Sequence, residues 1–287
     1  MTRKNIFEIL ENKWNIIDEI KRIYKLLNTE CINVRYSGNK TVIEFIDDYC
    51  FYDWKNRHSY LNISDMADDL DIELDENDIP ENLEIIDILK YLEFVRNLIM
   101  LCDTKLFIDN EKDGSDKYKY TYYKEYMVLE ENINIVLEHL NFSTNLLKKE
   151  EKIILIEKNP SAMSVAEIVD EDTACKVIEY NHYLLKGDID KKKEILLQLA
   201  NKYEGMKSNI KSLNSKLDDD IGFMLNNIHI RHNNKSGKSK KEYVSKMRKA
   251  TMEKWYDETY QMLLLAFLLN EQQNRSKKIN QLKEKIR

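Results

Sequence analysis

The hydrophobic residues of this 287-residue chain recur mostly at three- and four-residue steps, the spacing of one face of an α-helix. Residues 5–28 show the pattern, with Ile9 and Ile16 among their apolar positions. The same periodicity predicts further helices over residues 80–105, 118–148, 161–186, 188–204, 206–231 and 250–285. Gly187 and Gly205 mark breaks between helices, because glycine is a poor helix former.

A different pattern occupies residues 31–46. Residues 31–36 and 41–46 alternate apolar and polar side chains on either side of residues 37–40, which include Gly38. Two alternating runs around a glycine-containing turn predict a β-hairpin, which we expect to be the only sheet. The apolar run at residues 153–156 is short, so periodicity leaves it open between a strand and a helix.

Glycine and proline are scarce. The chain has 6 Gly and 2 Pro, whereas average usage gives roughly 20 and 14. Sandwiches, β-barrels and Rossmann sheets need many tight turns, which draw on these two residues. The composition therefore predicts a mainly α fold, with one or more helical bundles and one small β-hairpin near residues 31–46. Pro160 and the small residues after it mark a boundary. We expect an N-terminal helical region with the hairpin at residues 1–150 and a C-terminal helical bundle at residues 151–287.

The overall charge and the apolar pattern indicate a cytoplasmic protein. The net charge of −6 gives no general attraction for nucleic acid. No window of 18 apolar residues occurs and the N-terminus has no secretory apolar run, so we expect no contact with a membrane. The four cysteines lie far apart, without a CxxC pair, which favours buried reduced thiols over a disulfide.

Residues 68–87 contain ten acids and no Lys or Arg. This acidic segment is either a solvated face or a docking strip for a protein partner. A calcium loop beginning at Asp71 would need glycine at its sixth position and glutamate at its twelfth. Those positions hold Glu76 and Asn82, so the sequence predicts no metal site, and it predicts no cofactor.

Residues 231–249 reverse the charge, with eight Lys and Arg against the single acid Glu242. A local basic patch can attract phosphate groups although the whole chain is acidic. The alternative is a solvated loop that docks on the chain's own acidic segment. If the patch binds RNA, the contacts fall to Asn233, Asn234, Lys235, Lys238, Lys240 and Lys241. For Asn233, a left-handed cap on the preceding helix is the competing interpretation.

Arg231, His232 and His229 are the candidate catalytic residues. An arginine offers a fixed positive fork for a phosphate group. A neutral histidine near pH 7 can take a proton from a ribose 2′-hydroxyl or give one to a leaving oxygen. We therefore predict that Arg231 positions a phosphate and that His232 or His229 acts as general acid or base.

The run Arg231-His232-Asn233 closes a predicted long helix and precedes a loop and a terminal amphipathic helix. This arrangement resembles a HEPN domain over residues 161–285. HEPN domains are small helical bundles of abortive-infection and toxin–antitoxin systems, many of them metal-independent endoribonucleases with an active site formed across a dimer. The resemblance implies a homodimer that acts on RNA in antiviral defence or growth arrest.

The histidine spacing differs from the family's motif, which separates its arginine and histidine by four to six residues. Here His232 follows Arg231 directly, and neighbouring helix residues do not face each other. The two side chains converge only if the helix breaks between them or if two subunits share the site. The rival interpretation is a non-catalytic interaction protein that binds a partner through its bundle and acidic segment.

Two other motifs carry less weight. Residues 236–239 resemble the end of a phosphate-binding P-loop, but His232 stands where that motif requires glycine. Arg57 and His58 follow an aromatic run that includes Trp54. Such a cluster either stacks nucleobases or packs the hairpin against a helix, and we favour packing.

Overall fold

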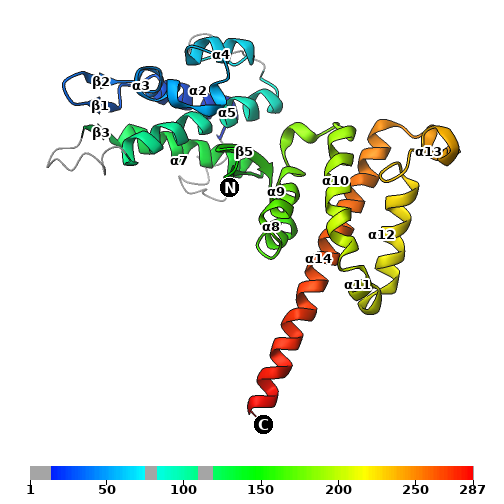
Figure 1. Ribbon diagram of the computed structural model, residues 1–287. Helices are drawn as coiled ribbons and strands as arrows, with labels where there is room; N and C mark the ends of the chain where they lie inside the picture. Colours follow the sequence, from blue (N-terminus) through cyan, green and yellow to red (C-terminus); the bar gives the residue numbers. More distant parts are fainter. Residues whose placement is uncertain (1–13, 75–82, 109–118, 287) are drawn as a thin grey trace, which may run out of the picture. The chain divides into compact units, whose positions relative to one another are not determined.

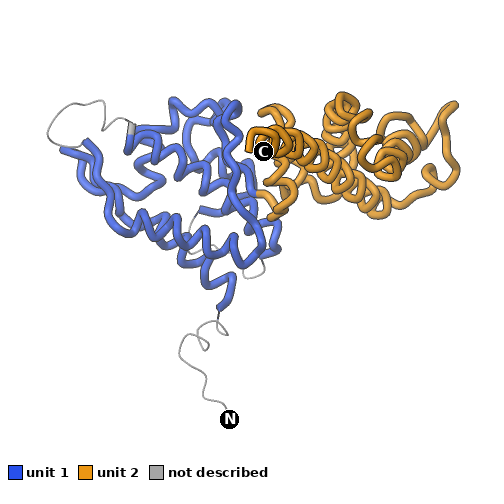
Figure 2. The backbone as a smooth tube through the Cα atoms, turned by 90° about the horizontal axis from the view of Figure 1, so that it is seen from below, with its two compact units in different colours: residues 1–155 blue, residues 156–287 orange. Residues whose placement is uncertain are grey.

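The computed structural model describes residues 14–74, 83–108 and 119–286. Over these residues the protein is mainly α-helical, which confirms the predicted fold class (Figure 1). The chain divides after Leu155 into two compact units, residues 1–155 and 156–287, which Figure 2 colours separately. The predicted boundary between residues 150 and 151 falls in the turn between the last two strands, shortly before this division.

Unit 1 combines helices with short strands. Its α-helices are α2 (Ile16–Leu27), α3 (Val42–Tyr49), α4 (Ile63–Asp69), α5 (Ile85–Asp103) and α7 (Lys124–His139). Its strands are β1 (Ile32–Val34), β2 (Gly38–Lys40), β3 (Tyr120–Tyr122), β4 (Phe142–Leu147) and β5 (Lys152–Glu157), the last of which continues into unit 2. Its short helical turns are η1 (Phe51–Asp53), η2 (Lys55–Arg57) and the π-turn η3 (Thr104–Ile108).

Helix α5 lies in the core of unit 1 and packs against α3 and α7. Leu89 and Tyr91 on α5 are both buried although they point to opposite sides of the helix, about 200° apart, so the helix is apolar on more than one side. Tyr91 on α5 stacks on Tyr24 of α2, with ring centroids 4.1 Å apart and the rings nearly parallel. Stacked aromatic pairs contribute about 0.5–1.5 kcal/mol beyond the area they bury.

The predicted hairpin is present, but its second strand and its turn are misplaced. Strands β1 and β2 pair antiparallel with Asn33 opposite Asn39, and β3 adds a third strand on the other side of β1. Residues 41–46, predicted as a strand, begin helix α3 instead. The reason is a capping box in which the Thr41 hydroxyl accepts from the Glu44 N–H and the Glu44 carboxylate accepts from the Thr41 N–H.

The expectation of a single sheet is wrong. Strands β4 and β5 form a second, two-stranded sheet. The apolar run that the sequence left open, residues 153–156, therefore lies in a strand. The predicted helix 118–148 is correct only for α7. Asn141 ends it in a left-handed conformation with φ 63°, and β4 follows.

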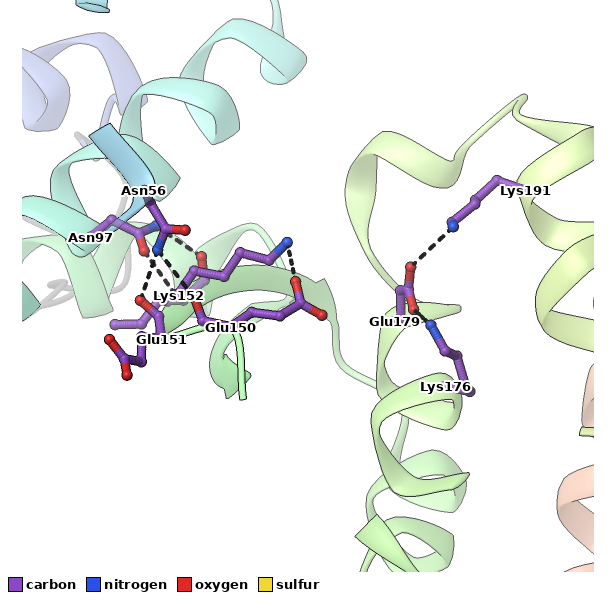
Figure 3. A network of polar contacts seen from close by, with 9 residues as sticks. Asn56, Asn97, Glu150, Glu151, Lys152, Lys176, Glu179 and Lys191 are labelled. Carbon is purple, nitrogen blue, oxygen red and sulfur yellow. Dashed lines mark hydrogen bonds and ion pairs between the residues drawn. The ribbon is translucent and has the colours of Figure 1, made fainter. Parts of the chain in front are cut away.

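Two asparagine side chains hold this second hairpin in unit 1 (Figure 3). Nδ2 of Asn56 donates to the carbonyl oxygens of Glu150 and Glu151, each at 3.1 Å. Asn97 on α5 pairs with Ile153 in both directions, since its Nδ2 donates to the Ile153 oxygen and its Oδ1 accepts from the Ile153 N–H, each at 2.8 Å. Asn97 is 9% exposed, so this pairing is shielded from water.

Unit 2 is a bundle of α-helices. These are α8 (Pro160–Ala166), α9 (Glu171–Glu179), α10 (Ile189–Glu204), α11 (Lys207–Leu213), α12 (Ser215–Asn227), α13 (Glu242–Ser245) and α14 (Lys249–Ile286), with the short turns η4 (Tyr183–Leu185) and η5 (Gly237–Ser239). The predictions of helices at 188–204 and 250–285 match α10 and α14. The predicted helices 161–186 and 206–231 are each broken, because Asp170 and Asn214 cap the N-termini of α9 and α12.

Helix α14 organises unit 2, because it packs against α8, α10, α11 and α12 before its last turns extend past the bundle (Figure 1). Its buried face carries Tyr256, Tyr260 and Leu263. Tyr260 stacks on Tyr180 with centroids 4.0 Å apart. The Tyr260 hydroxyl donates to the carbonyl oxygen of Val177 at 2.7 Å, which satisfies the polar end of a buried ring.

A buried lysine links α10 to α14. Lys192 is 7% exposed and lies 2.9 Å from Glu253 and 2.7 Å from Asp257. The Tyr180 hydroxyl donates to Asp257 at 3.0 Å, and the Gly187 N–H donates to Glu253 at 2.7 Å. Each charged group in this network therefore has an oppositely charged or hydrogen-bonding partner, which a buried charge requires.

A partly exposed ion-pair cluster on α9 and α10 differs from this buried network. Glu179 lies 2.6 Å from Lys176 and 3.8 Å from Lys191 (Figure 3). The Lys191 side chain is 38% exposed and also approaches Glu194 at 3.2 Å. Pairs this open to water stabilise a fold by about 0–1 kcal/mol each.

In the part of the chain that the structure describes, no helix has the length and apolar character that crossing a membrane requires.

Candidate functional site

The three candidate catalytic residues lie in a loop and not on a helix. They are His229, Arg231 and His232. Helix α12 ends at Asn227, and His229 has φ 68°, a left-handed conformation that closes the helical path. The Arg231 N–H then turns back to donate to the carbonyl oxygen of Leu225 at 2.9 Å. His229, and not Asn233, therefore takes the left-handed position that ends the helix.

Asn234 holds this loop in shape. Its Oδ1 accepts from the His229 N–H at 2.8 Å, and its Nδ2 donates to the Ser239 carbonyl oxygen at 3.2 Å. Its own carbonyl oxygen accepts from the Lys241 N–H at 2.8 Å. Asn234 is 1% exposed, so in this conformation it organises the loop backbone and does not present its amide to RNA.

Arg231, predicted to position a phosphate, is engaged within the protein. Its guanidinium makes an ion pair and hydrogen bond with Glu204 at the C-terminal end of α10. The Arg231 side chain is 22% exposed and Glu204 43% exposed, so the pair lies partly in water. The positive fork is thus directed at a carboxylate of the bundle, and no structural contact joins Arg231 to the His232 side chain among the described residues.

His229 lies beside two lysines instead. Its Nε2 is 3.5 Å from Nζ of Lys193 on α10. Burial lowers the pKa of His229, and the charges of Lys193 and Lys235 lower it further, against smaller opposing effects of the His232 backbone and Asp190. Burial also lowers the pKa of Lys193, partly offset by Asp190, and Lys235 lowers it again. The imidazole of His229 is therefore neutral near pH 7 and sits among positive charges.

Both lysines of this cluster lie apart from the carboxylates that the structure describes. Among the described residues, neither Lys193 nor Lys235 has a carboxylate oxygen within 4 Å of its ammonium nitrogen. Asp190, one turn before Lys193 on α10, acts on both His229 and Lys193 only at longer range. The cluster of Lys193, His229 and Lys235 therefore has positive charge to offer an anion.

The remaining predicted residues are solvent-exposed. His232 is exposed, and its carbonyl oxygen accepts from the Asn234 N–H at 2.9 Å. Asn233 is also exposed, and its Nδ2 donates to the Ser236 hydroxyl at 2.9 Å. Exposed lysines complete the loop, at Lys235, Lys238, Lys240 and Lys241. Only Lys240 of these four approaches a carboxylate among the described residues, that of Glu242 at 3.4 Å.

The sequence analysis did not identify Lys193 as a candidate site residue. It lies 36 positions before His229, in the middle of a predicted helix with several other lysines, so no local signal separates it from a solvated residue. Only the packing of α10 against the loop after α12 brings it to the histidine. Of the predicted catalytic residues, His229 lies beside Lys193, whereas Arg231 pairs with Glu204.

A shallow hollow adjoins the same loop. It has a volume of about 430 Å³ and is lined by Glu242, Tyr243, Lys246, Met247, Arg248 and Thr251. Tyr243 is 71% exposed, an unusual exposure for a large aromatic ring. Glu242 is paired with Lys246 at 2.7 Å.

The other candidates from the sequence have structural explanations or lie partly outside the described residues. Arg57 donates to the carbonyl oxygens of Tyr52 and Tyr60, at 3.1 Å and 2.8 Å, so it packs the local chain. Of the acidic segment 68–87, residues 75–82 lie outside the described residues. The structure describes all four cysteines and joins none of them in a disulfide, and burial raises the pKa of Cys31 to about 11. No group of three or more metal-ligating side chains forms among the described residues.

Comparisons with protein-family models, curated proteins and solved structures found no match to this chain.

Proposed function

We propose that unit 2 binds RNA at the loop of residues 229–241 and cleaves it without a metal ion, with His229 as the general base. The observation that carries this proposal is the 3.5 Å approach of His229 Nε2 to Lys193 Nζ, in a cluster whose lysines pair with no carboxylate among the described residues. Such a cluster attracts a phosphodiester. A histidine whose pKa is lowered is available as a base at neutral pH.

The arrangement supports a definite reaction. A phosphodiester bound between Lys193 and Lys235 presents the neighbouring ribose 2′-hydroxyl to His229. The imidazole takes the hydroxyl proton, the 2′-oxygen bonds to phosphorus, and the bond from phosphorus to the 5′-oxygen breaks. The leaving oxygen takes a proton from water, and the two ammonium groups stabilise the charge that develops on phosphorus. In this proposal Arg231 fixes the loop on Glu204 and does not touch the substrate.

The resemblance of residues 161–285 to HEPN domains supports the same class of activity and suggests its setting. We extend the proposal to a homodimer that acts on RNA in bacterial defence or growth arrest. His232 is exposed on the same loop and would reach RNA bound to a second subunit. The exposed Lys235, Lys238, Lys240 and Lys241 would guide the RNA backbone toward the loop.

The test is cleavage of a 5′-labelled single-stranded RNA in EDTA by the wild type and by His229→Asn, Lys193→Ala and Arg231→Ala. Asparagine tolerates the positive φ at position 229, so His229→Asn keeps the loop geometry. We expect loss of cleavage in His229→Asn and a large decrease in Lys193→Ala. Lys216→Ala is the control and should retain cleavage, because Lys216 pairs with Asp220 on α12 and has no part in the proposed site. Retained cleavage in a folded His229→Asn would refute the role of His229.

A second candidate function is a non-catalytic interaction protein. It is favoured by the last turns of α14, where Ile279, Leu282 and Ile286 are 47%, 55% and 76% exposed along one stripe. The acidic segment 68–87 would provide a further docking surface for a protein partner. Expression separates the two functions, since a ribonuclease should arrest growth in a way that His229→Asn relieves. An interaction protein should be harmless and should bind a protein partner that is lost when the exposed stripe is made polar.

A further inference from the structure

The residues that line the hollow beside the basic loop suit a planar aromatic ligand. Tyr243 is 71% exposed on its wall, and Arg248 and Thr251 line it on the side of α14. Arg248 forms no ion pair within the described residues, so its guanidinium is available to a ligand. A volume of about 430 Å³ is comparable to the smaller ligand pockets of proteins.

The floor of the hollow is fixed to the bundle. Val244, next to Tyr243 on α13, is 4% exposed, and Met252 at the start of α14 is 1% exposed. Met247 packs against the same core from the hollow itself. Tyr243 therefore lies on a helical turn that is anchored in the core. Ordering its side chain around a ligand costs less conformational entropy than ordering a free loop.

Asn234 connects the hollow to the cluster around His229. Oδ1 of Asn234 accepts a hydrogen bond from the His229 N–H. The backbone carbonyl oxygen of Asn234 accepts one from the N–H of Lys241, the residue just before α13. Asn234 thus bonds to the backbone at His229 and to the backbone just before α13, which carries Tyr243. The histidine of the cluster and the wall of the hollow therefore lie on one loop that Asn234 organises.

We propose that this hollow seats one nucleobase of the bound RNA, stacked on Tyr243, with Arg248 on an adjacent phosphate. The inference rests on the RNA function proposed above and adds a base-binding subsite to it. Every base offers a π-face, so stacking on an exposed tyrosine tolerates any sequence and favours the larger purines. The Glu242 carboxylate lies at the rim of the hollow and can accept a hydrogen bond from an exocyclic amino group of adenine.

The test measures binding of 5′-fluorescein-labelled A10 and U10 RNA by anisotropy. All proteins carry His229→Asn, so that no substrate is cut. We expect A10 to bind more tightly than U10 and Tyr243→Ala to weaken A10 binding about tenfold, the effect of losing one base stack. Tyr243→Phe keeps the ring and is the matched control, with less than a twofold change. Arg248→Ala should weaken binding and make it less sensitive to salt.

A photocrosslink identifies the contact directly. RNA that contains 5-iodouridine should give an adduct on Tyr243, located by mass spectrometry of the digested protein. If the protein binds A10 but Tyr243→Ala binds equally well and no adduct forms on Tyr243, the base seat is wrong and the RNA function stands. If neither RNA binds to the parent protein, both proposals fail. Circular dichroism of each variant shows that the fold is kept, which the exposure of Tyr243 leads us to expect.

Discussion

Nε2 of His229 lies 3.5 Å from Nζ of Lys193, and the positive charge of Lys193 adds to burial in lowering the pKa of His229. This contact joins a loop after α12 to the middle of α10. Burial and the positive charges of Lys193 and Lys235 give this histidine a pKa below its usual value, and Lys193 is a cation beside it. The sequence analysis assigned the proton transfer to His232 or His229 and the positive charge to Arg231. In the structure His229 has Lys193 beside it, and Arg231 pairs with Glu204.

The charge of Lys193 should be visible in the titration of His229. Replacing Lys193 by Met keeps most of the apolar stem but removes the positive charge, so the pKa of His229 should rise. It should stay below the usual histidine value, because burial is the largest cause of the shift and remains. NMR titration of the imidazole resonances measures this directly. Lys216→Met is the control, since Lys216 pairs with Asp220 and does not act on His229. An unchanged His229 pKa in Lys193→Met would contradict the contact.

Asn234 should be essential for the stability of the loop. Asn234→Ala removes two buried side-chain hydrogen bonds and leaves the His229 N–H and the Ser239 carbonyl oxygen without their partner. We expect a loss of about 2–3 kcal/mol in the free energy of unfolding of unit 2. Urea unfolding followed by circular dichroism measures it. Asn233→Ala, at an exposed position that bonds only to Ser236, should change the stability by less than about 1 kcal/mol. Equal losses in the two variants would refute the organising role of Asn234.

Long, strongly periodic segments of the fold could be predicted from the sequence, and short ones could not. Helices α10 and α14 follow from their apolar spacing and from the glycines before and after α10. Residues 41–46 contain Val42, Phe45 and Ile46, whose i, i+3, i+4 spacing is that of one helix face and not of one strand face. The Thr41 capping box decides for the helix, and a pattern count does not include it. The β4–β5 pair depends on Asn97, a tertiary contact that no local pattern shows.

The candidate site was also predictable only in part, because tertiary contacts determine which residues meet. The basic run at residues 231–249 and His229 are visible in the sequence, but the residues that Arg231 and His229 contact are not. Glu204 occupies Arg231, and Lys193 reaches His229, through the packing of α10 on the loop. The left-handed turn at His229 ends the helix before Arg231, so the predicted helix 206–231 does not reach the candidate residues.

Asn97 should stabilise unit 1 without affecting unit 2. Asn97→Ala removes the two-sided pairing with Ile153 and opens the attachment of β5 to α5. We expect a loss of about 2–3 kcal/mol for unit 1, measured by hydrogen exchange of the β4 and β5 amides. Asn56→Ala is the comparison, because it also bonds to this hairpin but at an exposed position. It should cost about 1 kcal/mol or less. Faster exchange that extends equally over unit 2 would contradict this prediction.

The network of Lys192 and Glu253 should make unit 2 sensitive to acid. Burial raises the pKa of Glu253, but hydrogen bonds from the Gly187 N–H and from Lys192 outweigh it, so the pKa lies below the usual value. A carboxyl with a lowered pKa in the folded state stabilises the fold above its unfolded pKa, near 4.5, and loses this contribution as the pH falls through its folded pKa. The wild type should therefore lose stability on acidification below about pH 4.5.

Glu253→Gln tests this dependence, because glutamine keeps the shape of the side chain but cannot ionise. At pH 7 the variant should be less stable than the wild type by about 1.5–3 kcal/mol, the range for a hydrogen bond to a charged group. At pH 4 and below the difference should narrow, since the wild-type carboxyl then gains a proton. Glu194→Gln, on the surface of α10 with its side chain 56% exposed, is the control and should be nearly neutral at both pH values. A stability difference for Glu253→Gln that does not change between pH 7 and pH 4 would show that its ionisation does not stabilise the bundle.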